Sequence, residues 1–187
     1  MEVHTTMIDG VLILEPKIFS DERGFFVETY NAARYGAAGV PALFVQDNLS
    51  CSKKGVVRGL HFQSPPFAQG KLVQVVRGSV FDVAVDIREG SPTFGKYVSV
   101  ELSAENHRQF FIPAGFAHGF MALEDDTLFQ YKCTNVYAPD HDGGIRYDDP
   151  DIGIVWPSIP PLVSEKDLLH PYLSDAPLVF SFDTTSL

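Results

Sequence analysis

Two histidines and a lysine stand in short apolar runs, where rigid strands could hold them for chemistry. The runs are Arg58-Gly-Leu-His61-Phe-Gln63, Gly70-Lys71-Leu-Val and Phe116-Ala-His118-Gly-Phe120. An imidazole moves protons near neutral pH, and an ammonium group stabilises an oxyanion beside it. The set therefore predicts acid–base chemistry at a carbonyl group. Each residue alone also fits a structural role, because many histidines are simply buried and hydrogen-bonded.

Proton abstraction next to a ketone needs a base, a donor for the opposite face and a group that stabilises the enolate oxygen. His61 could be the base, Tyr131 the phenolic donor and Lys71 the cation near the oxyanion. A carboxylate on the second imidazole nitrogen would fix the tautomer, and Asp167 is one candidate. Ser164-Glu-Lys-Asp167 also has the form of a helix capping box, which the spacing alone favours.

A metal site is the competing hypothesis for the histidines. His61, His118 and Asp82 could converge as a site of two histidines and one carboxylate. Position 59 is Gly and position 63 is Gln, so the His-x-His pair of many metal-binding β-barrels is missing. The sequence therefore disfavours a metal. Four further histidines lie in turn-like or terminal contexts and are predicted to be surface residues: His4, His107, His141 and His170.

The elements that must position these side chains are short strands separated by turn signals. We expect strands over residues 11–14, 25–29, 43–48, 56–62, 72–76, 80–87, 97–102, 109–112, 118–123 and 127–134. Arg77-Gly78-Ser79 is predicted to be a tight hairpin and Asp142-Gly143-Gly144 a turn. Short helices are expected over residues 31–38 and 165–169. This spacing indicates an all-β sandwich or barrel.

Strand alternation sorts the side chains between two faces. Asp82 and Ala84 share one face of their strand, opposite Phe81, and Tyr131 shares a face with Phe129 and Cys133. A regular strand would point Arg58 away from His61. Arg58 can act beside His61 only if Gly59 marks a bulge or the ligand is long.

Length and composition limit the class of protein. The chain has 187 residues, 45% of them hydrophobic, which fits one folded domain over residues 1–187 with a C-terminal arm from about residue 157. No apolar run is long enough to cross a bilayer, and no secretory signal is recognisable at the N-terminus. The net charge of −10 argues against nucleic acid, although local cations could bind a small anion. Two cysteines predict a reducing cytoplasm.

Taken together, ten collinear segments resemble the dTDP-4-dehydrorhamnose 3,5-epimerase family of the cupin superfamily. The resemblance implies a double-stranded β-helix, a cupin-like jelly-roll barrel with short peripheral helices, usually a homodimer that binds its sugar without metal or cofactor. The segments begin at Asp21, Gln46, Arg58, Gly70, Phe81, Ser91, Ile112, Tyr131, Ile152 and Ser164.

The resemblance also implies a role for each candidate residue. His61 matches the catalytic base, Asp167 its paired aspartate, Tyr131 the proton donor and Lys71 the group that stabilises the enolate. His118 matches a polar substrate-contacting position and Asp82 a supporting one. The implied contacts to the nucleotide and outer sugar positions are Arg23, Glu28, Gln46, Asn48, Arg58, Tyr137, Asp142 and Lys166. The segment around Arg23 is implied to reach the site of a neighbouring subunit.

The implied reaction is metal-independent epimerisation of dTDP-4-dehydro-6-deoxy-D-glucose at C3 and C5, through enolates, to dTDP-4-dehydro-L-rhamnose. A single-centre epimerase of a related nucleotide 4-keto-6-deoxy sugar is the main competing activity, since such a relative can keep the same acid–base residues. The barrel could also belong to a metal-dependent cupin enzyme or to a non-catalytic sugar-binding protein.

Overall fold

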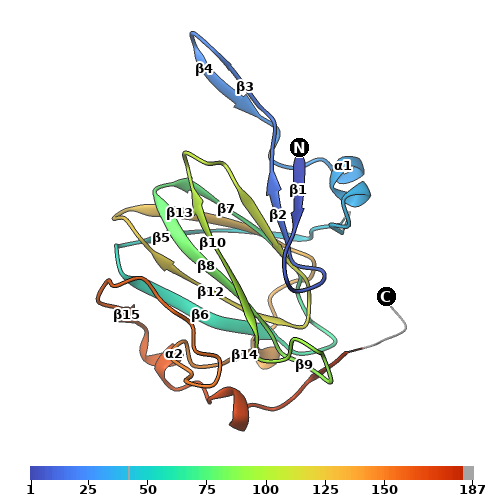
Figure 1. Cartoon of the computed structure of the whole chain (residues 1–187), viewed down its shortest axis with the longest axis vertical. Coiled ribbons are helices and arrows are strands. Elements are labelled where there is room, and N and C mark those ends of the chain that lie inside the picture. The colour runs from blue at the N-terminus through green and yellow to red at the C-terminus, as the bar shows by residue number, and fades with distance from the viewer. Residues whose placement is uncertain (42, 183–187) are drawn as a thin grey trace.

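Two stacked β-sheets form the body of the protein. The computed structural model describes residues 1–41 and 43–182. The first sheet has the order β1 (Glu2–Thr5), β2 (Leu12–Glu15), β11 (Gln109–Ile112), β7 (Lys71–Arg77), β13 (Thr127–Cys133) and β5 (Gln46–Ser52). The second has the order β10 (Tyr97–Ser103), β8 (Ser79–Asp86), β12 (Phe116–Ala122), β6 (Val56–Gln63) and β14 (Asp142–Gly144), and β15 (Leu162–Val163) pairs with β6. Figure 1 shows the sheets facing each other.

The main core lies between these sheets because alternate residues of each strand face inward. Val73, Val75 and Phe129 from the first sheet pack in one buried cluster with Ala84 and Phe120 from the second. On β8 the next residues along, Val83 and Val85, belong to a different buried cluster on the other face. The predicted alternation along this strand is confirmed.

The outer faces of both sheets are covered by chain outside the strands. Leu60 and Val85 on the second sheet pack against Ile145, Ile152 and Leu173 from the C-terminal third. The outer face of the first sheet is covered by α1 (Ala32–Ala37), whose Tyr35 is buried against Leu14, Leu72 and Phe111. The second helix, α2 (Glu165–Leu168), lies beside β6. The described residues thus confirm an all-β architecture with short peripheral helices.

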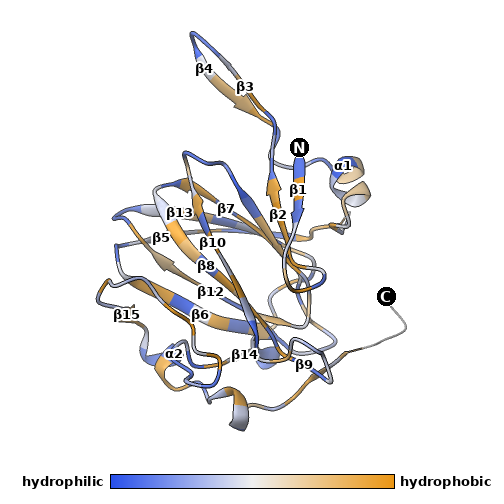
Figure 2. Cartoon of the chain, in the orientation of Figure 1, coloured by the Kyte–Doolittle hydropathy of each residue, from blue (hydrophilic) through white to orange (hydrophobic). Residues whose placement is uncertain are grey.

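A hairpin of β3 (Ile18–Asp21) and β4 (Gly24–Val27) projects from the body (Figure 1). Its phenylalanines are exposed, with relative accessibilities of 54% for Phe19, 60% for Phe25 and 68% for Phe26. Figure 2 shows orange, hydrophobic ribbon along this hairpin. Exposed aromatic surface of this kind marks interaction sites.

Two turn predictions are wrong. Arg77-Gly78-Ser79 does not join paired strands, because β7 and β8 belong to different sheets and Gly78 carries the chain from one sheet to the other. Asp142-Gly143-Gly144 forms β14, which pairs with Gln63, Phe62 and His61 of β6. In both places glycine makes room for a neighbouring residue, Thr127 at Gly78 and the rings of Phe62 and His170 at Gly143 and Gly144, which sequence patterns do not separate from a turn.

The remaining elements are small. Short strands β9 (Arg88–Glu89) and β16 (Phe180–Ser181) pair in parallel, and 3-10 helices span Pro139–His141 and Leu173–Asp175. Among the described residues, no helix combines the length and apolar character needed to span a membrane.

Candidate active site

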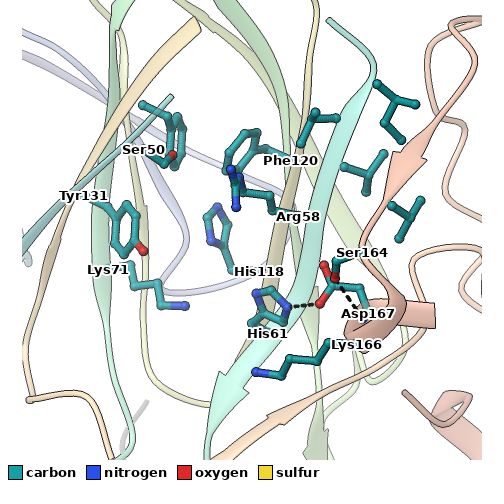
Figure 3. Close-up of a pocket in the computed structure, with 15 residues that line it drawn as sticks. Ser50, Arg58, His61, Lys71, His118, Phe120, Tyr131, Ser164, Lys166 and Asp167 are labelled. Atoms are coloured by element: carbon teal, nitrogen blue, oxygen red, sulfur yellow. Dashed lines mark hydrogen bonds and ion pairs between the residues drawn. The ribbon is translucent and has the colours of Figure 1, made fainter. Parts of the chain in front are cut away.

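A cavity of about 560 Å³ opens between the two sheets (Figure 3). The first sheet contributes Lys71 from β7 and Tyr131 from β13, and the second contributes His61 from β6 and His118 from β12. An adjoining cavity of about 360 Å³ shares His61, Lys71 and Tyr131 with it. The predicted catalytic residues are therefore brought together at one place in the fold.

His61 and Asp167 form a hydrogen-bonded pair at the edge of this cavity. The distance from His61 Nε2 to Asp167 Oδ1 is 2.7 Å, and the two side chains are 31% and 6% exposed. Burial acts to raise the pKa of Asp167, but the hydrogen bond and charge of His61 outweigh it and hold this pKa below its ordinary value. Asp167 is therefore an ionised carboxylate at neutral pH, able to support an imidazolium.

Asp167 also lies in the first turn of α2, as the capping-box pattern predicts. The Ser164 hydroxyl accepts a hydrogen bond from the Asp167 backbone N–H at 3.1 Å. The cap uses only this backbone group, which leaves the carboxylate free for His61. The two interpretations of Ser164-Glu-Lys-Asp167 are compatible.

Arg58 lines the cavity together with His61, against the expectation for a regular strand. The pairing of β6 with β12 shifts register between His61 and Arg58, which marks a bulge at Gly59. Gly59 has φ +131°, and a Cβ there would lie 2.5 Å from the Cα of Gly119. Only glycine tolerates this combination. The bulge turns Arg58 toward the cavity, where its Nε donates to Ser52 Oγ at 3.2 Å.

Lys71 and Tyr131 stand on the opposite side of the cavity from His61 (Figure 3). Burial lowers the pKa of the Lys71 ammonium, although the carboxylates of Asp142 and Asp82 act to raise it. Burial raises the pKa of the Tyr131 phenol. Tyr131 is therefore held as a neutral O–H donor. Phe129 and Tyr131 line the cavity and Cys133 is buried, in agreement with the prediction that the three share one face of the strand.

A second histidine–carboxylate pair lies deeper in the barrel. His118 Nε2 is 2.9 Å from Asp82 Oδ1, and both side chains are buried. Burial raises the pKa of Asp82, which the hydrogen bond and charge of His118 oppose. Asp82 does not line the cavity itself, but it contacts His118, which does. Because His61 pairs with Asp167 instead, the structure does not assemble His61, His118 and Asp82 into one ligand set.

Most of the predicted nucleotide-binding residues line the adjoining cavity: Gln46, Asn48, Tyr137, Asp142 and Lys166. Gln46 Oε1 accepts from the Tyr137 backbone N–H at 2.8 Å, which ties the aromatic residue to β5. Lys166 Nζ is 2.5 Å from Asp142 Oδ2. These contacts place polar and aromatic groups around an opening that leads to His61.

Arg23 and Glu28 do not line either cavity of their own chain. Arg23 lies at the tip of the projecting hairpin, where it pairs with Asp21, and Glu28 pairs with Arg34 at 3.2 Å. The hairpin points away from the barrel in Figure 1. Within one chain the structure therefore separates these two residues from the rest of the predicted site.

Sequence reasoning missed Ser50, which lines the cavity on β5. Its hydroxyl is buried without a hydrogen-bond partner among the described residues. The burial of β5 alternates, so Gln46, Asn48 and Ser50 share the inward face. Extending the period of two from Gln46 and Asn48 identifies Ser50.

The prediction that His170 is a surface residue is wrong. Its side chain is 12% exposed, and its Nε2 lies 3.6 Å from Asp167 Oδ1. Burial lowers the pKa of His170, and the charge of His61 acts in the same direction. The neighbouring Pro171 gives a turn signal, which hides the fact that this loop folds back onto β6.

The fold and the cavity together define a cupin-like jelly-roll barrel whose interior cavity is lined by histidine, lysine and tyrosine side chains. A family model described as dTDP-4-dehydrorhamnose 3,5-epimerase matches residues 5–175. A protein of that name from Shigella flexneri is 57% identical over 169 residues, covering 90% of this chain and 93% of the relative. The chain therefore belongs to the dTDP-4-dehydrorhamnose 3,5-epimerase family, as the resemblance implied.

Solved structures agree with this assignment. A dTDP-6-deoxy-D-glucose-3,5-epimerase from Legionella pneumophila, in complex with dTDP-4-keto-L-rhamnose, superposes with a TM-score of 0.94 at 50% identity, covering 98% of this chain and 99% of that one. A 3′-monoepimerase from Streptomyces bikiniensis, in complex with dTDP-quinovose, gives a TM-score of 0.86 at 38% identity, covering 91% and 87%. The predicted cupin-like fold is confirmed.

Proposed function

We propose that this chain epimerises dTDP-4-dehydro-6-deoxy-D-glucose at C3 and C5 to dTDP-4-dehydro-L-rhamnose. The C4 ketone acidifies the hydrogens on both flanking carbons. The observation that carries the proposal is the position of His61 and Tyr131 on facing sheets of one cavity (Figure 3). A base and a donor on opposite sides of a sugar ring invert the carbon between them.

In the first half of each step, His61 removes the proton and the bonding electrons move onto the C4 oxygen. His61 Nε2 bonds to Asp167, so Nδ1 is the nitrogen that accepts the proton. Asp167 then stabilises the imidazolium. Lys71 donates to the enolate oxygen, a contribution that grows as negative charge develops there.

In the second half, the Tyr131 hydroxyl protonates the carbanion from the opposite face. The enolate electrons return to carbon, the ketone re-forms and the configuration is inverted. His61 and Tyr131 then exchange protons with solvent and recover their starting forms. One base serves both carbons because C3 and C5 flank the same carbonyl.

The adjoining cavity is proposed to hold the dTDP part. Gln46 and Asn48 supply amide groups, Tyr137 a ring for stacking on thymine, and Arg58 and Lys166 positive charge for the diphosphate. Asp142 positions Lys166 through their ion pair. Arginine and lysine recognise phosphate oxygens by charge-assisted hydrogen bonds.

We also propose a homodimer in which the hairpin carries Arg23 and Glu28 toward the partner's cavity. The exposed Phe19, Phe25 and Phe26 support this arrangement, because association would cover them. Sedimentation equilibrium should give twice the chain mass of 20.7 kDa. A monomer with full activity would reject this arrangement. We further propose a cytoplasmic location, which the unpaired Cys51 and Cys133 support.

The single-centre activity is the second candidate, because the monoepimerase relative has the same fold. A single-centre epimerase needs the same base and donor as a double epimerase. The two activities are therefore distinguished by whether one or two carbons of the sugar exchange protons with solvent.

The test of the proposed activity is His61→Asn, with turnover and dTDP binding measured separately. General-base catalysis contributes about 10²- to 10⁴-fold, so turnover should fall by at least this range while calorimetric dTDP binding persists. The matched control is His107→Asn, because His107 has φ +52° and asparagine tolerates this conformation. Full activity in His61→Asn would reject the assignment.

A further inference from the structure

A second imidazole lies beside Asp167 but does not line the cavity. His170 Nε2 is buried and has no hydrogen-bond partner among the described residues. It lies 3.6 Å from Asp167 Oδ1, the same oxygen that is 2.7 Å from His61 Nε2. The rings of His61 and His170 meet edge to face, with centroids 5.7 Å apart. A buried ring nitrogen without a partner requires an explanation.

The three side chains lie close enough together to bind one metal ion. One ligand atom from each of His61, Asp167 and His170 lies within 4.8 Å of the other two. Zn²⁺ binds imidazole nitrogen at about 2.0–2.1 Å and carboxylate oxygen at about 2.0–2.2 Å, in tetrahedral geometry. Neighbouring ligand atoms of such an ion are therefore roughly 3.3 Å apart. The distances from Asp167 Oδ1 to His61 Nε2 and His170 Nε2 are 2.7 and 3.6 Å, so small side-chain shifts would bring both to the spacing of zinc ligands.

The surrounding backbone holds the three side chains in place. Gly144 makes room for His170, because a Cβ at residue 144 would lie 2.5 Å from His170 Nε2. Asp167 is held by the Ser164 cap through its backbone N–H and by His61 through its carboxylate. A carboxylate oriented in this way is typical of metal ligands.

We propose that His61, Asp167 and His170 form a Zn²⁺-binding site whose occupation inhibits the enzyme. Two imidazoles and one carboxylate suit Zn²⁺, which commonly takes water as a fourth ligand when the protein supplies three. Zn²⁺ bonded to Nε2 requires the His61 tautomer with its proton on Nδ1. That proton occupies the Nδ1 lone pair, which in the proposed mechanism accepts the proton from the substrate. No net proton is gained or lost when the neutral ring changes tautomer.

Direct metal binding tests the site without relying on turnover. Chelator-treated protein is titrated with Zn²⁺ by calorimetry, and with Co²⁺ to record the visible absorption of a tetrahedral complex. One Zn²⁺ per chain is expected. His170→Gln and His170→Asn should weaken binding by more than the roughly 10- to 100-fold lost when a group that only orients a ligand is removed. Two variants guard against one failing to fold.

The matched control is His4→Gln. His4 lies in an exposed cluster with Glu2 and Glu15, the other group of described residues with suitable spacing. This variant should bind Zn²⁺ as the wild type does. Absence of stoichiometric binding in the wild type, or unchanged binding in both His170 variants, would overturn the site.

The inhibitory effect rests on the proposed epimerase activity and is measured separately. Zn²⁺ at saturation should abolish turnover in the wild type and in His4→Gln, and a chelator should restore it. Bound Zn²⁺ with undiminished turnover would overturn the inhibition. If the protein binds Zn²⁺ but its chelator-treated, metal-free form also lacks epimerase activity, the site is supported and the proposed function is rejected, so the two failures are distinguishable.

Discussion

Replacing Asp167 with Asn removes the negative charge beside His61 and keeps the shape of the side chain. The carboxylate is 6% exposed and accepts from His61 Nε2 at 2.7 Å. When His61 takes a proton from the sugar, the variant offers the imidazolium only a neutral amide. The expected consequence is a lower kcat with dTDP binding largely retained.

The size of the effect follows from the strength of this contact. A hydrogen bond to a charged group contributes about 1.5–3 kcal/mol. Each 1.36 kcal/mol of barrier corresponds to about tenfold in rate, so kcat should fall roughly 10- to 150-fold. The pair is partly buried, which limits screening by solvent.

Stability provides an internal control for Asp167→Asn. The Ser164 cap survives, since it uses the backbone N–H of residue 167. Because the folded-state pKa of Asp167 lies below the ordinary value of 3.8, its contribution to stability is present above that value. It is lost as pH falls through the folded-state pKa. The stability difference between wild type and variant should therefore disappear in acid.

The assay is steady-state turnover of the nucleotide sugar, followed by product NMR. Glu165→Gln is the matched control, because it neutralises an exposed carboxylate of the same helix. This control should retain wild-type kcat. A variant at residue 167 that keeps more than half of wild-type kcat would refute the role given to the carboxylate.

Four further predictions concern the cavity and its support. Lys71→Met should lower kcat about 10²- to 10³-fold, as expected for loss of one donor to an oxyanion; a change below threefold would exclude that role. Because the pKa of Lys71 is lowered, wild-type activity should decline with rising pH before the ordinary lysine value of 10.5, and a pH profile without this decline would contradict the assignment. Tyr131→Phe should still exchange substrate hydrogen for deuterium but should not invert the carbon; normal inversion would remove Tyr131 from the mechanism. Gly59→Ala should cost at least about 1–3 kcal/mol through backbone strain, measured by urea unfolding, and unchanged stability would contradict the bulge.

Strand alternation predicted much of the barrel interior. A period of two was enough to put Ala84 on the face of β8 opposite Val83 and Val85, and Tyr131 and Cys133 on the same face as Phe129, although only the structure shows which face is inward. These predictions hold because pleating fixes the direction of every second side chain. At Arg58 a regular period of two does not hold, because a bulge at Gly59 adds one residue and changes the face of the preceding side chains, which is the exception predicted from the sequence.

Contacts between distant segments were beyond the reach of sequence patterns. Local spacing identified the cap at Ser164, but only the fold shows that Asp167 meets His61, 106 residues earlier. His170 was missed for the same reason. The residues of the projecting hairpin, Arg23 and Glu28, were assigned to the site from the family resemblance, and one chain alone does not bring them there.

The central claim is that one base in this cavity removes protons from both carbons beside the C4 ketone. The most direct measurement is deuterium incorporation from heavy water into dTDP-4-dehydro-6-deoxy-D-glucose, with NMR of the product sugar. The account predicts label and inverted configuration at C3 and C5, and no label with His61→Asn. Label at only one carbon would indicate the single-centre activity. No label in a wild-type protein that still binds dTDP would contradict catalysis by this site.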